Sequence, residues 1–239
     1  MKQLLSFFVL LCILNSCQSE FKPVTFKTTT INKVYEADIS VIFNEAEGKN
    51  ELSKTINFKI EEAIISTLND ATKKTNLEFI LNDFNAEYIN FKKDFPDAYE
   101  PKWELYIETE KTYQSEAIIT IAISTYEFKG GAHGNDKIRF INLNAKTGDL
   151  LTKDDLIKDI GAFKALAKTH FKKALDNENK ALEMEDFFFG KPFQLPKNIG
   201  FSDDGLVLLY NVYEIASYDQ GYTEFVIPFD EIESLLILN

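Results

Sequence analysis

Two stretches in the first half of the chain repeat apolar residues every three or four positions, the period of a helix with one buried face. The first covers residues 53–69, and its apolar positions are Leu52, Ile56, Ile60, Ala63, Ile64 and Leu68. The second covers residues 77–95 and ends at Pro96, whose ring cannot continue a helix. We expect both stripes to pack into a core rather than to form a ligand groove.

The pattern changes to alternation, the period of a strand, after residue 102. Residues 103–107 alternate in this way and lead to a predicted hairpin turn at residues 114–115. Residues 117–128 follow as the strongest predicted strand, because β-branched residues occupy both of its faces. Further strands are predicted over residues 34–43 and 137–143.

The second half of the chain repeats this mixture on a smaller scale. Thr152 and Asp155 have the spacing of a capping box, from which we expect a helix to run to about residue 177. Strands are predicted over residues 206–213, after a hairpin turn, and over residues 223–227, before a short C-terminal helix. Between helix and strands lies an irregular stretch in which we expect three aromatic residues to be buried: Phe187, Phe188 and Phe189.

Helices and antiparallel hairpins come in blocks instead of in strict alternation, so the pattern predicts an α+β fold. We expect a helix pair packed on an antiparallel sheet, followed by a second, smaller α+β unit packed against it. No internal repeat or low-complexity linker separates the two predicted domains, residues 30–135 and residues 136–239, so we expect these halves to pack together. Residues 17–29 are expected to be a tether that leads into the fold.

Residues 1–16 have the character of a signal peptide. Lys2 precedes an apolar run over residues 4–14, which is too short to span a bilayer but has the length of a signal-peptide core. The run ends in Leu14-Asn15-Ser16-Cys17, which resembles the lipobox of bacterial lipoproteins. This resemblance implies cleavage before Cys17 and lipidation of its thiol. The alternative is an ordinary secretory signal with an incidental cysteine.

Cysteine usage agrees with a lipid anchor. The chain has two cysteines, Cys12 inside the predicted signal peptide and Cys17 at the predicted lipidation site. The mature domain would then hold no disulfide, and its core alone would stabilise it. No later apolar run approaches membrane length, so we expect an extracytoplasmic protein of the cell envelope, anchored by lipid on the periplasmic or outer-membrane face.

Charge narrows the classes of partner. The chain carries 26 basic and 38 acidic residues, for a net charge of −12, and Arg139 is the only arginine. Nucleic-acid binding requires a basic stripe, which this sequence lacks, so nucleic acid is not an expected partner. An acidic surface favours cationic partners and speeds their encounter, although it also serves solubility alone.

Known catalytic patterns are missing from the sequence. The two histidines, His133 and His170, stand 37 positions apart, and nothing brings a third zinc ligand to them. There is no G-x-S-x-G elbow, and Gly130-Gly131 lacks the lysine of a phosphate-binding loop. We therefore assign no catalytic residue, no metal and no cofactor, and expect a binding protein rather than an enzyme. A glycosidase-type carboxylate pair stays open among the 38 acids.

Two loops are candidate binding segments. In the first, Gly130, Gly131 and His133 form a sharp turn, in which His133 bonds nearby backbone, contacts a ligand or partner, or acts as a general base. In the second, the residues suited to stacking on a sugar or filling a protein cleft are Tyr218, Asp219, Gln220 and Tyr222. The alternative for this second loop is a turn that Tyr218 and Gly221 close. His170 lies on an apolar stripe and is expected in the core.

Three segments resemble known families. The block that ends in YEFKGGAHGN resembles the N-terminal domain of PdaC-type peptidoglycan deacetylases. FINLNAKTGDLLTKDDL and YNVYEIASYDQGYTEFVIPFDEIESLL resemble the junction and the closing part of the C-terminal domain of RsiV-type anti-sigma factors. These are the domains of unknown function 4163 and 3298, often found in tandem, and the resemblance covers most of residues 30–236.

The resemblance implies alternative functions. Some relatives carry a deacetylase domain, and others carry a transmembrane helix and a sigma-factor-binding segment behind an outer domain that senses lysozyme. In those sensors a recurring tyrosine matches Tyr218, and a proline often stands where this chain has Ser217. We expect the extracytoplasmic pair without either attachment, binding a cell-wall component such as peptidoglycan fragments or a cationic wall-degrading enzyme such as lysozyme. The alternatives are a peptidoglycan-modifying enzyme or accessory protein, acting by deacetylation or glycan hydrolysis, and a purely structural lipoprotein.

Overall fold

The structure, a computed structural model, describes residues 21–68, 76–97, 101–177 and 184–237. The predicted signal peptide, Cys12, Cys17 and the first part of the tether lie outside these ranges. No helix in the described ranges is long and apolar enough to cross a bilayer.

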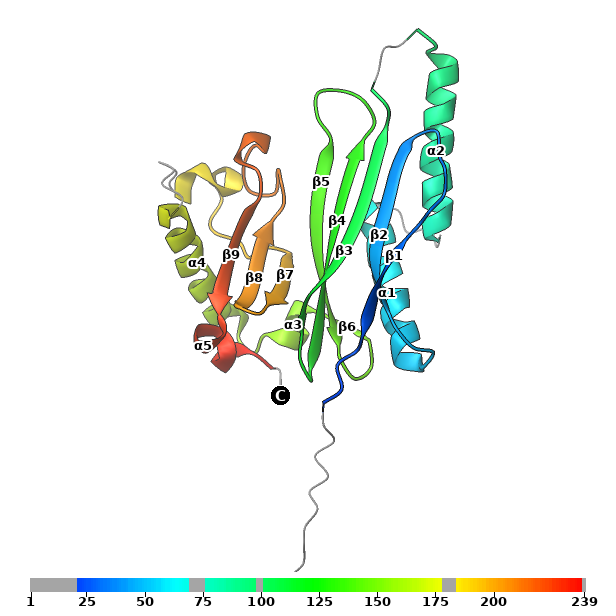
Figure 1. The fold of residues 1–239 in the computed structure, drawn as a ribbon. Coiled ribbons are helices and arrows are strands. Elements are labelled where there is room, and N and C mark those ends of the chain that lie inside the picture. Colours follow the sequence, from blue (N-terminus) through cyan, green and yellow to red (C-terminus); the bar gives the residue numbers. More distant parts are fainter. Residues whose placement is uncertain (1–20, 69–75, 98–100, 178–183, 238–239) are drawn as a thin grey trace, which may run out of the picture.

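Six strands form one sheet in the order of the chain (Figure 1). They are β1 (Phe26–Thr30), β2 (Asp38–Ala46), β3 (Glu104–Gln114), β4 (Ile118–Phe128), β5 (Asn135–Asn144) and β6 (Leu150–Leu151). All neighbours are antiparallel except β2 and β3, which run parallel. The expectation of an antiparallel sheet is wrong at this pair, because two helices connect β2 to β3 and bring the chain back in the same direction.

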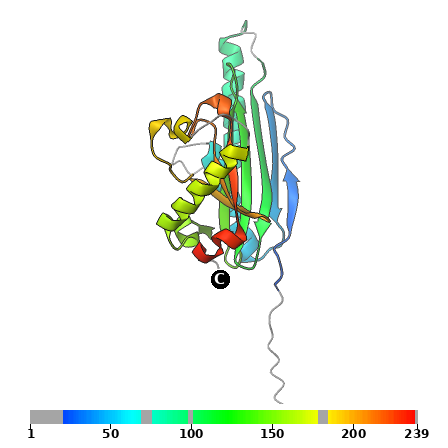
Figure 2. The same ribbon diagram turned by 90° about the vertical axis from the view of Figure 1, so that its left-hand side faces the viewer.

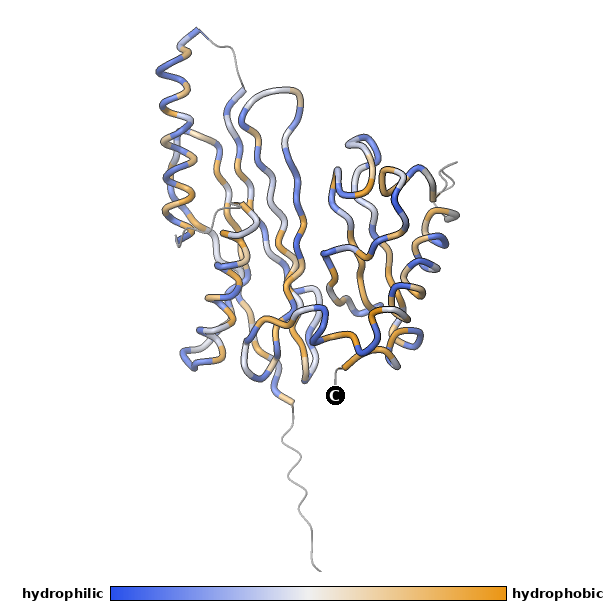
Figure 3. Tube along the Cα trace, turned by 180° about the vertical axis from the view of Figure 1, so that it is seen from behind, coloured by the Kyte–Doolittle hydropathy of each residue, from blue (hydrophilic) through white to orange (hydrophobic). Residues whose placement is uncertain are grey.

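These two helices are α1 (Glu51–Leu68) and α2 (Leu77–Asp94), and they confirm the predicted helices to within two residues at each end. Hydrophobic residues recur along them between hydrophilic ones, as Figure 3 shows. The apolar stripe of α1 packs on the sheet and leaves Ile56, Ile60 and Ile64 almost without exposed surface. The helix period in the sequence therefore reports burial against the sheet.

The second unit contains three antiparallel strands, β7 (Asn198–Ser202), β8 (Gly205–Tyr210) and β9 (Thr223–Pro228). The long helix α4 (Ile160–Asn177) crosses one face of these strands (Figure 2), and the short helix α5 (Phe229–Ile232) follows β9. Helices and sheets are thus segregated in both units, which confirms the α+β class.

Strand β4 separates two hydrophobic cores. Ile119 belongs to the core under α1 and α2, whereas its neighbour Ile118 belongs to the core of the second unit, and both are fully buried. Side chains on opposite faces of one strand therefore hold the two units together. The units also approach closely at Gly200, where an added Cβ would lie 2.5 Å from Phe140 Cγ.

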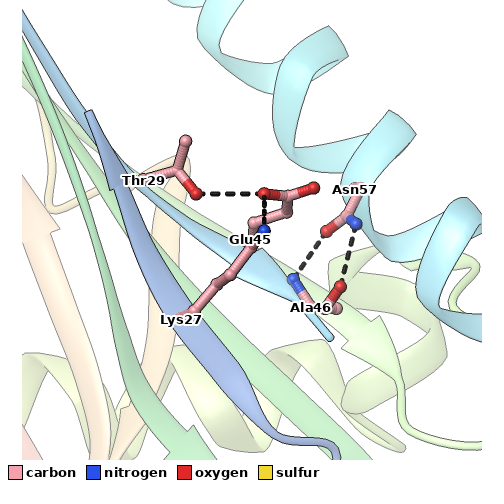
Figure 4. A network of polar contacts seen from close by, with 5 residues as sticks. All are labelled: Lys27, Thr29, Glu45, Ala46 and Asn57. Atoms are coloured by element: carbon pink, nitrogen blue, oxygen red, sulfur yellow. Dashed lines mark hydrogen bonds and ion pairs between the residues drawn. The ribbon is translucent and has the colours of Figure 1, made fainter. Parts of the chain in front are cut away.

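Residues 26–29, expected as tether, form most of β1 instead. Glu45 on β2 accepts a hydrogen bond from Thr29 Oγ1 at 3.0 Å and forms an ion pair with Lys27 at 3.0 Å (Figure 4). Asn57 of α1 fixes the end of β2 by bonding both the N–H and the carbonyl of Ala46. Apolar and polar residues do not alternate along β1. Polar contacts with β2 stabilise the strand instead.

The structure bears on two further predicted boundaries. The domain boundary predicted at residues 135–136 falls at the start of β5, which pairs along its length with β4 and so stays in the first sheet. The helix predicted to start at Thr152 is interrupted, because α3 (Lys153–Leu156) ends where Ile157 bridges to Leu236. The capping bond itself is present, with Thr152 N donating to Asp155 Oδ2 at 2.8 Å.

The irregular stretch of the second unit is built from two short 3₁₀ turns, η1 (Met184–Asp186) and η2 (Phe188–Gly190). Phe187 and Phe188 are buried as expected, but Phe189 is 64% exposed and corrects the prediction for that residue. The backbone of Phe188 and Phe189 takes positive φ values of 61° and 51°, which turns the two successive side chains in different directions.

Candidate functional site

The two candidate loops meet in space. The imidazole of His133, from the β4–β5 loop, stacks on the phenol ring of Tyr218, with ring centroids 4.0 Å apart and planes inclined by 20°. Tyr218 begins the 3₁₀ turn η3 (Tyr218–Gln220) of the second unit. The stack therefore joins the two units at the end of the molecule opposite the described start of the chain (Figure 1).

Glycines give the β4–β5 loop its shape. Gly130 and Gly131 have φ values of 91° and 98°, which glycine adopts without the strain of a side chain. Gly134 has a different role, because an added Cβ would lie 2.3 Å from the ring of Tyr126. His133 Nδ1 lies 2.9 Å from the carbonyl oxygen of Gly134, so the imidazole is held by local backbone while its face meets Tyr218. The backbone contact expected for His133 is present, and the ring in addition contacts Tyr218 of the same chain.

More tyrosines extend this surface. Tyr126 stacks on Tyr106 across β4 and β3, with centroids 5.7 Å apart. Tyr213 lies 5.5 Å from Tyr218, is 56% exposed and has a φ of 65°, a rare value for a residue other than glycine. We call the following six residues the aromatic face: Tyr106, Tyr126, His133, Tyr213, Tyr218 and Tyr222.

Three members of the aromatic face carry no functional signal in the sequence: Tyr106, Tyr126 and Tyr213. Tyr106 and Tyr126 sit at opposed positions of neighbouring strands, which only the β3–β4 register reveals. Tyr213 precedes the candidate loop and carries no local motif, so its positive φ is visible only in the structure. Strained backbone of this kind often accompanies functional surfaces.

Carboxylates surround the aromatic face. Tyr106 Oη donates to Asp38 Oδ2 at 3.1 Å, and Asp136 stands opposite Tyr126 in the β4–β5 register. Burial, with Asp38 as a further cause, raises the pKa of Tyr106 to about 12. Burial, followed by Asp136 and Tyr218, raises the pKa of Tyr222 to about 12. These phenols therefore stay protonated at neutral pH, and the negative charge of the surface comes from carboxylates.

Four carboxylates near the aromatic face differ from Glu127, which pairs with Lys129. In the ranges that the structure describes, none of Asp38, Glu104, Asp136 and Asp219 forms an ion pair. Burial raises the pKa of Tyr126 first, and the nearby charges of Glu104 and Asp136 raise it further. The face thus combines flat aromatic rings with uncompensated negative charge.

The rest of the second loop is held as a tight turn. Gln220 N donates to Ser217 O at 3.1 Å, and Gly221 N donates to Tyr218 O at 3.0 Å. The hydroxyl of Ser217 donates to the carboxylate of Asp219. Ser217 has a φ of −68°, a value that proline also takes, so serine reproduces the backbone that proline would impose. Gly221 closes the turn with a φ of 68°.

The second histidine lies far from this chemistry. His170 is buried on α4, and its Nε2 is 3.0 Å from Glu231 Oε2 of α5. The hydrogen bond from His170 lowers the pKa of Glu231. His170 is thus a bonded core residue, as its place on the apolar stripe predicted. No three His, Cys, Asp or Glu side chains in the described part of the chain lie together as a metal-binding group.

Each half of the chain matches a known protein family. Residues 28–136 match the family described as Deacetylase PdaC, and residues 148–230 match the family described as Protein of unknown function (DUF3298). The chain thus carries the PdaC and DUF3298 family matches one after the other, and we refer to it as the tandem. The aromatic face of this tandem takes Tyr106, Tyr126 and His133 from the first match and Tyr213, Tyr218 and Tyr222 from the second. The PdaC match connects the tandem with the cell envelope and an extracytoplasmic location.

Solved structures show the same fold. A DUF3298 family protein from Pseudomonas aeruginosa PAO1 superposes with a TM-score of 0.65 at 22% identity, covering 90% of this chain and 95% of its own. A DUF3298 family member from Bacteroides fragilis NCTC 9343 gives the same TM-score and coverage at 18% identity. No curated protein matches the sequence. The tandem is thus similar in fold over nearly its whole described length to both structures.

Proposed function

We propose that the tandem is a lipid-anchored binding protein of the cell envelope that recognises a cationic wall-degrading enzyme, such as lysozyme, through its aromatic face. The observation that carries this proposal is the stack of His133 on Tyr218, which joins loops of both units into one surface. Tyrosine rings are frequent binding hot spots, since they bury a large area at small entropic cost.

Charge supports a cationic partner over a neutral one. Asp38, Glu104 and Asp136 lie beside the rings without ion pairs among the described residues. Lysine and arginine side chains of a partner would meet these carboxylates and stack on the phenols. A wall-derived sugar would use the rings but leave the carboxylates without a counter-charge, so the cationic enzyme is the better fit.

The position of the two ends of the described chain is consistent with a lipid anchor at Cys17. The described chain starts and stops at one end of the molecule, whereas the β4–β5 loop and η3 lie at the other (Figures 1 and 2). Lipid on Cys17 would therefore hold the protein by the end opposite the aromatic face. A partner that approaches from the wall side would meet that face first.

Calorimetry of the full chain in detergent micelles, titrated with lysozyme, tests the proposal. We expect Tyr218→Ala to weaken binding at least tenfold, because a central tyrosine commonly contributes more than about 1.4 kcal/mol. Phe79→Ala, which removes an exposed ring from α2, is the matched control and should bind like wild type. Affinity should fall as salt rises from low to physiological concentration. Absence of binding heat at both salt concentrations would reject lysozyme as the partner.

The family match to deacetylases favours one second candidate, removal of acetyl groups from peptidoglycan. Acetate release from purified peptidoglycan, compared between the native chain and His133→Ala, tests it. Release by the native chain that falls in the variant would support this candidate. Equal background rates would remove it, and muropeptide titration in the same calorimeter would then test wall binding without chemistry.

A further inference from the structure

A cavity of about 590 Å³ runs along the open edge of β5, apart from the aromatic face. Its wall carries four cationic side chains and one carboxylate, in a protein whose net charge is −12. The charged residues of the wall are Lys137, Arg139, Lys153, Lys197 and Glu214. They come from four segments of the fold: β5, the start of α3, the residue before β7 and the turn after β8. The cavity wall is therefore positively charged, in contrast to the net negative charge of the chain.

Arg139, the only arginine of the chain, lines this cavity. Its guanidinium is half-buried beside α1 and donates a hydrogen bond to Ser66 Oγ. No carboxylate in the described ranges lies within ion-pair distance of it. Burial lowers the pKa of Arg139, yet an arginine keeps its charge in proteins. A guanidinium has five N–H donors, so an anionic ligand in the cavity can accept from those that Ser66 does not use.

The other polar groups of the cavity are already bonded. Asn198 Oδ1 accepts from Phe140 N at 2.7 Å, and Asn211 Oδ1 accepts from Ile138 N at 2.8 Å, so amide side chains satisfy the edge of β5. Glu214 Oε2 accepts from Asn211 N at 2.9 Å and is thus engaged on the backbone of its own turn. The cationic side chains are the groups that the cavity leaves for a ligand.

We propose that this cavity binds a small organic anion of the phosphate-ester class, with Arg139 as its main contact and Lys153 and Lys197 as further charges. A guanidinium forms paired hydrogen bonds with phosphate oxygens, and lysines add point charges around them. The volume suits a ligand of sugar-phosphate size, within the usual range of about 300–1,000 Å³. A monocarboxylate would leave most of the cations uncompensated, so phosphate is the better match.

Equilibrium titration of the full chain in detergent micelles tests this site, with glycerol 3-phosphate as probe and acetate for comparison. We expect saturable binding of glycerol 3-phosphate and at least tenfold weaker binding of acetate. Arg139→Gln should weaken phosphate binding at least tenfold, and Arg139→Lys less, because lysine keeps the charge but loses the paired geometry. Lys197→Gln should weaken it about threefold. Lys168→Gln removes an exposed lysine of α4 outside the cavity and should have no effect.

Vesicles distinguish a soluble ligand from a lipid headgroup. Sedimentation with phosphatidylglycerol vesicles that depends on Arg139, beyond the binding to phosphatidylcholine vesicles, would assign the site to headgroups. Binding of the soluble probe alone would assign it to free phosphate esters. Because Arg139→Gln also loses the bond to Ser66, a melting curve accompanies it, and Lys197→Gln tests the site if Arg139→Gln fails to fold. Equal binding by wild type and Lys197→Gln, or no saturable binding, would overturn the proposal.

Discussion

The core between the six-stranded sheet and α1–α2 is mainly aliphatic, whereas the core of the second unit is rich in phenylalanine. The first has regular elements on both sides, where branched side chains fit between a helix and a pleated sheet. The second is closed in part by the irregular stretch around η1 and η2. Large aromatic rings fill the space beneath η1 and η2, where few regular backbone elements are available for packing. Phe171 is the clearest example.

Phe171 is fully buried at the centre of the second core. Its ring lies within 6 Å of five other aromatic rings, those of Phe187, Phe188, Phe193, Tyr210 and Phe225. Ile121 is equally buried in the aliphatic core, where most of the buried side chains are branched and no ring cluster surrounds it. The comparison teaches that equal burial does not give equal sensitivity to substitution.

The largest expected effect follows from Phe171→Ala, which should lower the free energy of unfolding by about 3–5 kcal/mol. Ile121→Val should cost only about 0.5–1.5 kcal/mol, because a single methylene is lost. Urea unfolding followed by circular dichroism measures both. Equal losses in the two variants would contradict the difference between the cores.

Asn198→Ala acts on the junction of the two units rather than on either core. It removes the acceptor of Phe140 N, and an unsatisfied buried donor costs about 1–3 kcal/mol. We expect the units to unfold in two separate calorimetric transitions in this variant, instead of one in wild type. Asn135→Ala, an exposed position at the start of β5, is the control and should keep one transition. A single transition with unchanged midpoint in Asn198→Ala would show that the amide does not couple the units.

Gly134→Ala and Gly131→Ala compare two positions of the β4–β5 loop beside the aromatic face. The added methyl would displace the Tyr126 ring at a cost of about 1–3 kcal/mol, and we expect lysozyme binding to fall several-fold. Gly131→Ala introduces backbone strain at a φ of 98° but meets no atom within 4 Å, so it should lower the melting temperature with little change in affinity. The reverse order of affinities would place the binding surface elsewhere.

The smallest effect is expected from Glu231→Gln, which weakens the contact between α4 and α5 in the second unit. The pKa of Glu231 in the folded protein lies below its ordinary value of 4.5, so ionisation stabilises the fold above that pH. This contribution is lost as pH falls through the folded pKa. We therefore expect a small drop in melting temperature near pH 6 that disappears towards pH 3. A difference that persists at pH 3 would point to packing instead of charge.

The sequence predicted the regular elements well because their periods are local. The stripes of α1 and α2 and the β-branched run of β4 each record burial on a known face. Strand β1 escaped notice because Phe26–Thr30 has no alternating pattern and depends on its partner β2. The parallel β2–β3 pairing and the break before α4 also depend on contacts between distant residues, so no local pattern could reveal them.

The candidate site was predictable in its parts but not in its assembly. His133 and Tyr218 were each singled out by loop composition, yet nothing in the sequence indicated that their rings stack. Tyr106 and Tyr126 belong to strands whose register had to be known first. Arg139 was noticed only as the single arginine, since the cavity around it is formed by segments from both halves of the chain.

Strand β5 belongs to the first sheet, but its residues 137–144 lie between the two matched family ranges, 28–136 and 148–230. A fragment that ends at residue 136 would therefore lose β5 from the first sheet, and one that starts at residue 148 would leave β5 without the second unit beside it. Asn198 and Asn211 would likewise lose the backbone groups that they bond. We expect a chimera of two relatives to fold only when β5 comes from the same protein as Asn198 and Asn211.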